Sequence, residues 1–230
     1  MDKQRQFDKE LEDLKKRLIH MAALAETMID KAIGELVERN ARVAERVPQY
    51  EEEINRLQIE IDEAALTLLA TRQPVAGDLR FIVAATKING ELERIGDLAI
   101  NITQNAQTLL GQPPLKPLID LPHMADLARK MVRDSLDAFV GGDALLAQSV
   151  IMADDRVDAL KDQVLRELLT YMLSDPRTIE RALALILVSR HLERIGDHAV
   201  NIAEDVIYMT QGRDVRHPRT PKERPPDLET

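Results

Sequence analysis

One segment of this chain occurs twice, one hundred positions apart. Residues 91–104 read ELERIGDLAINITQ and residues 191–204 read HLERIGDHAVNIAE, with the shared core Leu-Glu-Arg-Ile-Gly-Asp-x-Ala-x-Asn-Ile. Self-similarity at a fixed spacing is typical of a duplicated structural unit. The 230 residues are therefore expected to hold two copies of one supersecondary unit that superpose helix for helix.

The similarity between the two halves extends upstream of the repeated segment, at a slightly different spacing. Residues 19–33 match residues 122–136 at an offset of 103, whereas the repeated segments are offset by 100. Three extra residues must therefore lie in the first copy, and insertions are tolerated best in loops. Their position near Arg72–Asp78 predicts a turn between the second and third helices of that copy.

Composition and periodicity predict that the repeated unit is helical. Aromatic residues make up only 3% of the chain, too few for a typical β protein. The apolar series from Ile88 to Ile102 steps by four and three, which is the seam of a helix, and it recurs from Val188 to Ile202. We predict an all-α fold of two tandem three-helix bundles. The expected helices cover residues 5–40, 50–72, 78–110, 121–140, 154–173 and 177–210.

Prolines mark the expected domain boundaries. Four of the 11 prolines fall between Gly111 and Pro122, and four fall in the charged tail after Gly212. Such segments are typical of linkers and of disordered ends. The predicted organisation is a first bundle at 1–110, a linker at 111–121, a second bundle at 122–212 and a disordered tail at 213–230.

The start of the last helix is apolar on more than one side. Leu183, Ile186 and Leu187 accompany Leu185 and Val188 there. A helix that is apolar all round packs against neighbours on two faces. The sequence therefore predicts a second contact surface at this place, either between the two bundles or between two subunits.

Charge and residue usage exclude several classes of protein. The net charge of −9 argues against a nucleic-acid-binding protein, which needs a basic surface. The chain has no cysteine, so thiolate nucleophiles and sulfur-ligated metal sites are excluded. Its sequence shows no secretory signal and no apolar run long enough to span a bilayer, so we expect a cytoplasmic protein without direct membrane insertion. It also has no glycine-rich phosphate loop and no nucleophile elbow.

Acidic and amide side chains recur at helical spacing beside the apolar seams. Residues four apart share one face of a helix, and like charges at that spacing cost roughly a few tenths of a kcal/mol. Because these faces point away from the seams, they are solvated surface, partners of nearby lysines and arginines, or ligands of a hard cation. The candidate metal ligands are Glu51, Asn55, Glu93, Asp97, Asp154, Asp158, Glu193 and Asp197.

Four segments give the chain a specific resemblance to the PhoU family, the accessory proteins of phosphate-specific transport systems. They are RQPVAGDLR at 72–80, ELERIGD at 91–97, LLTYMLSDPRTI at 168–179 and HLERIGDHAVNI at 191–202. The resemblance implies tandem three-helix bundles, a homodimer, and a cytoplasmic regulator rather than an enzyme. It further implies negative regulation of phosphate uptake and of the phosphate-starvation response, through coupling of the phosphate ABC transporter ATPase to a sensor histidine kinase.

The resemblance also implies a use for the acidic faces, because some family members carry multinuclear iron or zinc clusters on E/D-x-x-x-D motifs. Those motifs fall on the candidate ligands named above, and magnesium or manganese would suit the same oxygen donors. Asn55 departs from the pattern where the second copy has Asp158, so the first site is expected to be less charged. Two alternatives stay open: a metal-dependent hydrolase acting on phosphate esters, and a metal-free helical adaptor whose acidic face binds a basic partner.

Overall fold

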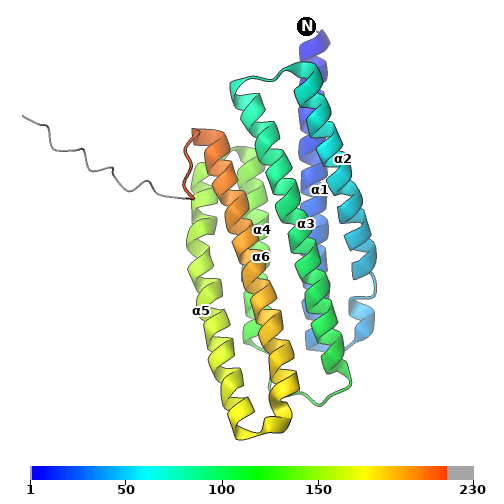
Figure 1. Cartoon of the computed structure of the whole chain (residues 1–230), viewed down its shortest axis with the longest axis vertical. Helices are drawn as coiled ribbons and strands as arrows, with labels where there is room; N and C mark the ends of the chain where they lie inside the picture. Colours follow the sequence, from blue (N-terminus) through cyan, green and yellow to red (C-terminus); the bar gives the residue numbers. More distant parts are fainter. Residues whose placement is uncertain (1, 217–230) are drawn as a thin grey trace, which may run out of the picture.

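The computed structural model describes residues 2–216, and within them it contains helices and no strand. The first three α-helices and the last three each form a bundle, which Figure 1 shows. The expected all-α fold of two tandem three-helix bundles is confirmed. The tail predicted at 213–230 lies mostly outside the described residues. The helices are α1 (Asp2–Glu38), α2 (Val47–Arg72), α3 (Ala76–Leu110), α4 (Asp120–Gly141), α5 (Ala144–Ser174) and α6 (Ile179–Gln211), with the short 3-10 helices η1 (Ala41–Val43) and η2 (Pro176–Thr178).

Helix α5 begins ten residues earlier than the predicted 154–173. Asp143 caps it, because its carboxylate accepts hydrogen bonds from two backbone N–H groups of the first turn, at 2.9 and 3.0 Å. The equivalent residue of the first copy, Asn40, caps only η1. Pro48 then prevents a continuous helix, since proline lacks an N–H and its ring clashes with the carbonyl four residues earlier. The second copy has Ile151 at the corresponding place, so its helix runs on.

The turn between α2 and α3 holds the three extra residues predicted for the first copy. Residues 73–75 join the two helices, and Gln73 adopts a left-handed backbone with a φ of 50°. The second copy turns more tightly at Asp175, whose carboxylate accepts a hydrogen bond from the backbone N–H of Arg177 at 3.1 Å. The predicted location of this turn is therefore confirmed.

The apolar seams of α3 and α6 form the centres of the two bundles. All five seam residues of α3, from Ile88 to Ile102, are fully buried, and so are their five counterparts from Val188 to Ile202. Full burial of each large aliphatic side chain contributes roughly 1.5–3 kcal/mol. The helical periodicity predicted from the sequence is confirmed. Within residues 2–216, no helix is long and apolar enough to cross a membrane.

The two bundles pack against each other through α3 and α6, which run antiparallel, and through α1 and α4 (Figure 1). Across the first of these contacts, the ammonium of Lys87 lies 2.7 Å from the carboxylate of Asp205. The last helix therefore has a second contact surface between the bundles, but the residues that predicted such a surface do not all lie in it. Two of the residues that predicted it are open to solvent, because Leu183 is 47% exposed and Leu187 is 42% exposed.

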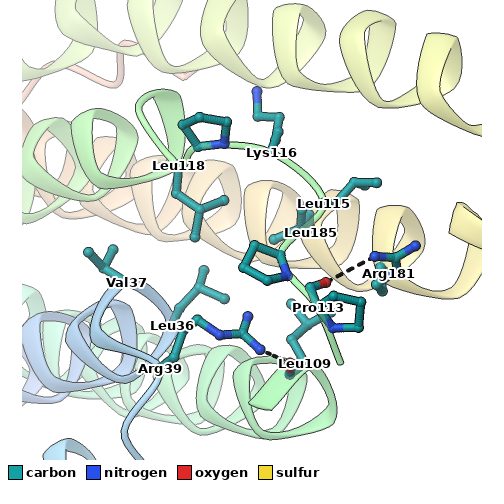
Figure 2. Close-up of a pocket in the computed structure, with 12 residues that line it drawn as sticks. Leu36, Val37, Arg39, Leu109, Pro113, Leu115, Lys116, Leu118, Arg181 and Leu185 are labelled. Carbon is teal, nitrogen blue, oxygen red and sulfur yellow. Dashed lines mark hydrogen bonds between the residues drawn. The ribbon is translucent and has the colours of Figure 1, made fainter. Parts of the chain in front are cut away.

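Two arginines hold the linker between the bundles in place. The guanidinium of Arg39 donates hydrogen bonds to the last carbonyl oxygens of α3, those of Leu109 and Leu110, at 2.9 and 3.1 Å, and to the carbonyl oxygen of Gln112 in the linker. Arg181 at the start of α6 donates to the carbonyl oxygen of Pro113 at 2.9 Å. Figure 2 shows the largely apolar pocket of about 220 Å³ that the linker forms with the ends of α1, α3 and α6. The linker is thus fixed to both bundles.

Candidate functional site

Seven of the eight predicted ligands form two groups, one in each bundle, at the place where its second helix packs beside its third. In the second bundle, α5 supplies Asp154 and Asp158, and α6 supplies Glu193 and Asp197. We call these four residues the second acidic cluster. Gly196 lets the two helices approach, because a methyl group there would lie only 3.3 Å from Asp154 Oδ1. Close packing of α5 and α6 therefore gathers the four carboxylates.

A lysine that sequence analysis missed lies within the second acidic cluster. The ammonium of Lys161 donates hydrogen bonds to Asp158 at 3.0 Å and to Glu193 at 3.1 Å, so it bridges α5 and α6. The hydrogen bond to Asp158, helped by Glu193, raises the pKa of Lys161 above its ordinary value although burial opposes this. The lysine is therefore a permanent counter-ion. Its spacing of three residues from Asp158 was the available sequence signal, and that spacing does not reveal the contact with α6.

The crowding of these carboxylates affects their protonation. Burial, followed by the charges of Asp197 and Asp158, raises the pKa of Asp154 to about 6. Burial and then the charge of Glu193 also raise the pKa of Asp197 above its ordinary value. Like charges held close together disfavour one another's ionisation. A cation among these side chains would relieve that repulsion.

The first bundle brings together Glu51 of α2 with Glu93 and Asp97 of α3, and we call these three residues the first acidic cluster. Burial and then the charge of Asp97 raise the pKa of both Glu51 and Glu93. Gly96 again lies at the helix contact, but a methyl group there would lie 3.1 Å from Cδ1 of Ile54 rather than near a carboxylate. The same backbone contact therefore presents an apolar neighbour in one bundle and an acidic neighbour in the other.

Two positions distinguish the first acidic cluster from the second. Asn55, which is exposed, stands in the place of Asp158, and Gln58 stands in the place of Lys161. The first cluster thus has three carboxylates and no lysine, and the second has four carboxylates and one lysine, so each has a formal charge of −3. Among the predicted ligands themselves the first site is the less charged one, as expected, and only the addition of Lys161 brings the second site to the same formal charge.

The metal assignment stays a prediction. In residues 2–216, no three histidine, aspartate or glutamate side chains converge closely enough to hold one ion. The donor chemistry nevertheless fits a hard cation, because the predicted ligands offer only carboxylate and amide oxygens. In the second acidic cluster, the ammonium of Lys161 marks a position that attracts positive charge.

One buried and one half-buried glutamate were also missed by sequence analysis. Neither carboxylate oxygen of the fully buried Glu35 has a hydrogen-bond partner among the described residues, and burial raises its pKa, with Gln107 opposing. Burial would likewise raise the pKa of Glu91, but contacts with His198 at 2.6 Å and Asn201 at 3.0 Å outweigh it and lower that pKa. Single acidic residues among apolar ones form no periodic pattern, so their burial depends on packing that the sequence does not display.

Proteins of one family resemble this chain along nearly its whole length. A profile of the PhoU domain matches residues 18–106 and again residues 121–206, once in each bundle. A phosphate-specific transport system accessory protein PhoU homolog from Aquifex aeolicus is 46% identical over 209 residues, which are 91% of this chain and 95% of that protein. The homolog from Pseudomonas putida is 45% identical over 214 residues, which are 92% of this chain and 83% of that protein.

Solved structures give the same result. The crystal structure of PhoU from Pseudomonas aeruginosa matches 90% of this chain and 100% of its own, with a TM-score of 0.86 and 41% identity. The phosphate transport system regulatory protein PhoU from Streptococcus pneumoniae matches 92% of this chain and 100% of its own, with a TM-score of 0.84 and 27% identity. The similarity in sequence and in fold thus covers both bundles.

Proposed function

Because the chain belongs to the PhoU family, we propose that it is a cytoplasmic regulator that represses phosphate uptake and the phosphate-starvation response. It would do so by coupling the ATPase of the phosphate ABC transporter to its sensor histidine kinase. Relatives named as accessory proteins of phosphate-specific transport systems support a role in phosphate transport. The family consists of accessory proteins, and this chain is not an enzyme, so the hydrolase alternative is not carried further.

The family match in both bundles is the observation that carries this proposal. A relay between a transporter and a kinase needs two protein contacts, and a duplicated fold offers two related surfaces. The net charge of −9 suits basic partner surfaces, and such contacts should weaken as salt rises, since the screening length is about 10 Å at about 0.1 M. We also expect the protein to form a homodimer, which sedimentation equilibrium would detect.

Gene deletion tests the regulatory proposal. A strain without this protein should express its phosphate-starvation genes even in phosphate-rich medium, because a repressing relay has been lost. A reporter fused to a phosphate-starvation promoter measures this, and complementation with the wild-type gene is the control. Normal repression in the deletion strain would overturn the proposal.

We further propose that the two acidic clusters bind a metal, with a multinuclear iron or zinc cluster as the first candidate and magnesium or manganese as the alternatives. The raised pKa of Asp154, which reaches about 6 through burial and neighbouring like charges, supports this because a cation would remove the repulsion. Asp154, Asp158, Glu193 and Asp197 would hold it in the second bundle, and it would supply positive charge that ties α5 to α6.

Elemental analysis of untagged protein, purified without chelating resin, tests the metal proposal. The wild type should contain metal, and the pair Glu193→Ala with Asp197→Ala should contain less while its circular dichroism spectrum stays unchanged. Wild-type protein without metal under these conditions would favour the metal-free adaptor.

A further inference from the structure

The pocket beside the linker combines apolar and positively charged residues in a chain whose net charge is −9. Its twelve lining residues include three cations and no carboxylate, and the other nine are apolar. Leu36, Leu109 and Leu185 are buried, and Figure 2 shows Leu36 and Leu118 pointing toward each other across the pocket. Such a lining favours a ligand that is largely apolar and carries a negative charge.

Two of the three cations have no acidic partner. The ammonium of Lys116 is paired with the carboxylates of Asp120 and Glu167. The guanidiniums of Arg39 and Arg181 donate only to backbone carbonyl oxygens, and in the described part of the chain neither forms an ion pair. Each uses a single nitrogen for these bonds, Nη2 in Arg39 and Nη1 in Arg181, whereas a guanidinium has five N–H donors. Both arginines therefore keep charge and donors for an anion.

The backbone at Arg39 is unfavourable for an arginine. Its φ of 53° lies in the left-handed region, which glycine adopts readily and other residues adopt rarely. The equivalent residue of the second copy is Gly142, whose φ is 62°. The first copy thus keeps an arginine where the fold favours glycine, and that arginine lines the pocket.

The duplicated fold has an equivalent place at the opposite end of the interface between the bundles (Figure 1). There Phe81 of α3 stacks on Phe139 of α4, with ring centroids 5.1 Å apart and an interplanar angle of 15°. The counterparts of these two residues are Arg181 and Leu36, which line the pocket. Two stacked aromatic rings therefore occupy one end of the interface, and a cavity with a guanidinium occurs at the other.

This comparison indicates which size of ligand the pocket suits. Leu185 stands in the place of Ala85 and makes up only part of the difference in volume, because a cavity of about 220 Å³ remains. An apolar cavity of about 150 Å³ is large enough for benzene, and pockets for drug-sized ligands begin at about 300 Å³. The pocket therefore fits one aromatic ring with a small substituent, and its two unpaired arginines favour an acidic substituent.

We propose that this pocket binds a free small molecule with one aromatic ring and one carboxylate. The ring would lie among the leucines and prolines, and the carboxylate would accept hydrogen bonds from Arg39 and Arg181. The ends of α1 and α3 and the start of α6 line the pocket, so the bound molecule would tie the two bundles together at the linker. The proposal is independent of the relay function, which concerns protein partners.

Titration with phenylacetate tests the pocket on the full-length protein, with labelled leucine methyl groups and a buffer without phosphate. The methyl signals of Leu36 and Leu185 should shift and saturate, with a dissociation constant on the order of 1 mM or below for a ligand of about ten non-hydrogen atoms. Phenylacetamide lacks the charge and acetate lacks the ring, so each should bind at least about tenfold more weakly. Equal binding of either one, or no saturation by about 50 mM phenylacetate, would overturn the proposal.

Variants connect the binding to this pocket. Arg181→Gln removes one positive charge and should raise the dissociation constant about five- to tenfold, whereas Arg190→Gln, at an exposed position of the same helix, should change it less than about twofold. The triple variant Leu36→Phe, Arg181→Phe, Leu185→Ala carries the residues of the opposite end and should not bind phenylacetate. Phenylacetate should raise the melting temperature of the wild type and not that of the triple variant. Undiminished binding to the triple variant would place the site elsewhere and overturn the proposal.

An aromatic side chain of a partner protein is the competing occupant. A short peptide with one phenylalanine between two aspartates, blocked at both ends, offers the same chemistry from a protein. If this peptide binds more tightly than phenylacetate and loses its binding in the triple variant, the pocket belongs to a protein partner and the proposal of a free small molecule is wrong. Equal or weaker binding of the peptide supports the small molecule.

Discussion

The two acidic clusters reach the same formal charge with different residues. The first has three carboxylates beside Asn55 and Gln58, whereas the second has four carboxylates with Lys161 among them. In the second cluster the ammonium of Lys161 already forms hydrogen bonds with two of the carboxylates, so a cation from solution must compete with it. In the first cluster the corresponding residue is a neutral glutamine. A count of acidic residues alone therefore overestimates how much more strongly the second cluster attracts a metal ion than the first.

The largest expected effect tests whether the two bundles provide equal frameworks for these clusters. Ile95 and Ile195 occupy equivalent places in the seams, and both are fully buried. Replacing either one with alanine leaves a cavity and should lower the free energy of unfolding by about 2–5 kcal/mol, with the two losses agreeing within about 1 kcal/mol. Urea denaturation followed by circular dichroism measures both. Clearly unequal losses of unfolding free energy would show that the two bundles are not equivalent frameworks.

The second largest expected effect is a gain in stability when Asp154, whose pKa is raised, is made neutral. A carboxyl with a higher pKa in the folded than in the unfolded protein contributes stability below its ordinary pKa of 3.8, and that stability is lost as the pH rises through about 6. Each pKa unit corresponds to about 1.4 kcal/mol, and partial exposure reduces the total. Asp154→Asn should therefore stabilise the metal-free protein by about 1–2 kcal/mol at about pH 7.5, with no gain at about pH 3.

Glu51→Gln is the matched change in the first bundle. Burial and the charge of Asp97 raise the pKa of Glu51 as well, so the gain should have the same sign and the same loss toward low pH. It should be smaller than the gain from Asp154→Asn, since fewer carboxylates surround Glu51. Thermal unfolding over a pH series compares the two variants. A gain that does not depend on pH would show that relief of charge is not its cause.

Much of the fold could be predicted because helix packing leaves a periodic trace in the sequence. The seam from Ile88 to Ile102 and its copy in α6 gave the bundle centres, and the change of offset gave the turn at residues 73–75. The start of α5 was misplaced because the prediction followed the first copy, where Pro48 interrupts the helix. Ile151 has no such effect, so the helix of the second copy begins at Ala144 and runs through this position.

The candidate site could be predicted only in part. Spacing of four residues along one helix placed Glu193 beside Asp197, and the duplication paired them with residues of α5. The bridge from Lys161 to Glu193 depends on how close two helices approach, which Gly196 decides and no spacing along one helix reveals. Leu183 was predicted to be buried and is exposed for a related reason. An apolar side chain favours burial, but its sequence position does not show whether a neighbouring element covers it.

Exchanging Lys161 and Gln58 between the two clusters tests whether the lysine competes with a metal ion. Lys161→Gln removes two hydrogen bonds to carboxylates and should destabilise the metal-free protein by about 0.5–1.5 kcal/mol. Gln58→Lys places an ammonium in the first cluster and should stabilise by about 0.5 kcal/mol. Cation affinity should move the opposite way, rising in Lys161→Gln and falling in Gln58→Lys. Manganese titration monitored by electron paramagnetic resonance measures the affinity, and parallel shifts in both variants would contradict the competition between lysine and metal.

The smallest expected effect comes from Asn55→Asp, which gives the first cluster the fourth carboxylate of the second. The new charge lies four residues after Glu51 on an exposed position, so it should cost roughly a few tenths of a kcal/mol in the metal-free protein. Combined with Gln58→Lys it should cost nothing, because the double variant has the charged residues of the second cluster and the new pair has the spacing of Asp158 and Lys161. A double-mutant cycle on urea midpoints should therefore show a favourable coupling of about 0.5 kcal/mol. Strict additivity would mean that a lysine at this position does not reach the carboxylates, and that Lys161 depends on the closer approach of α5 to α6 at Gly196.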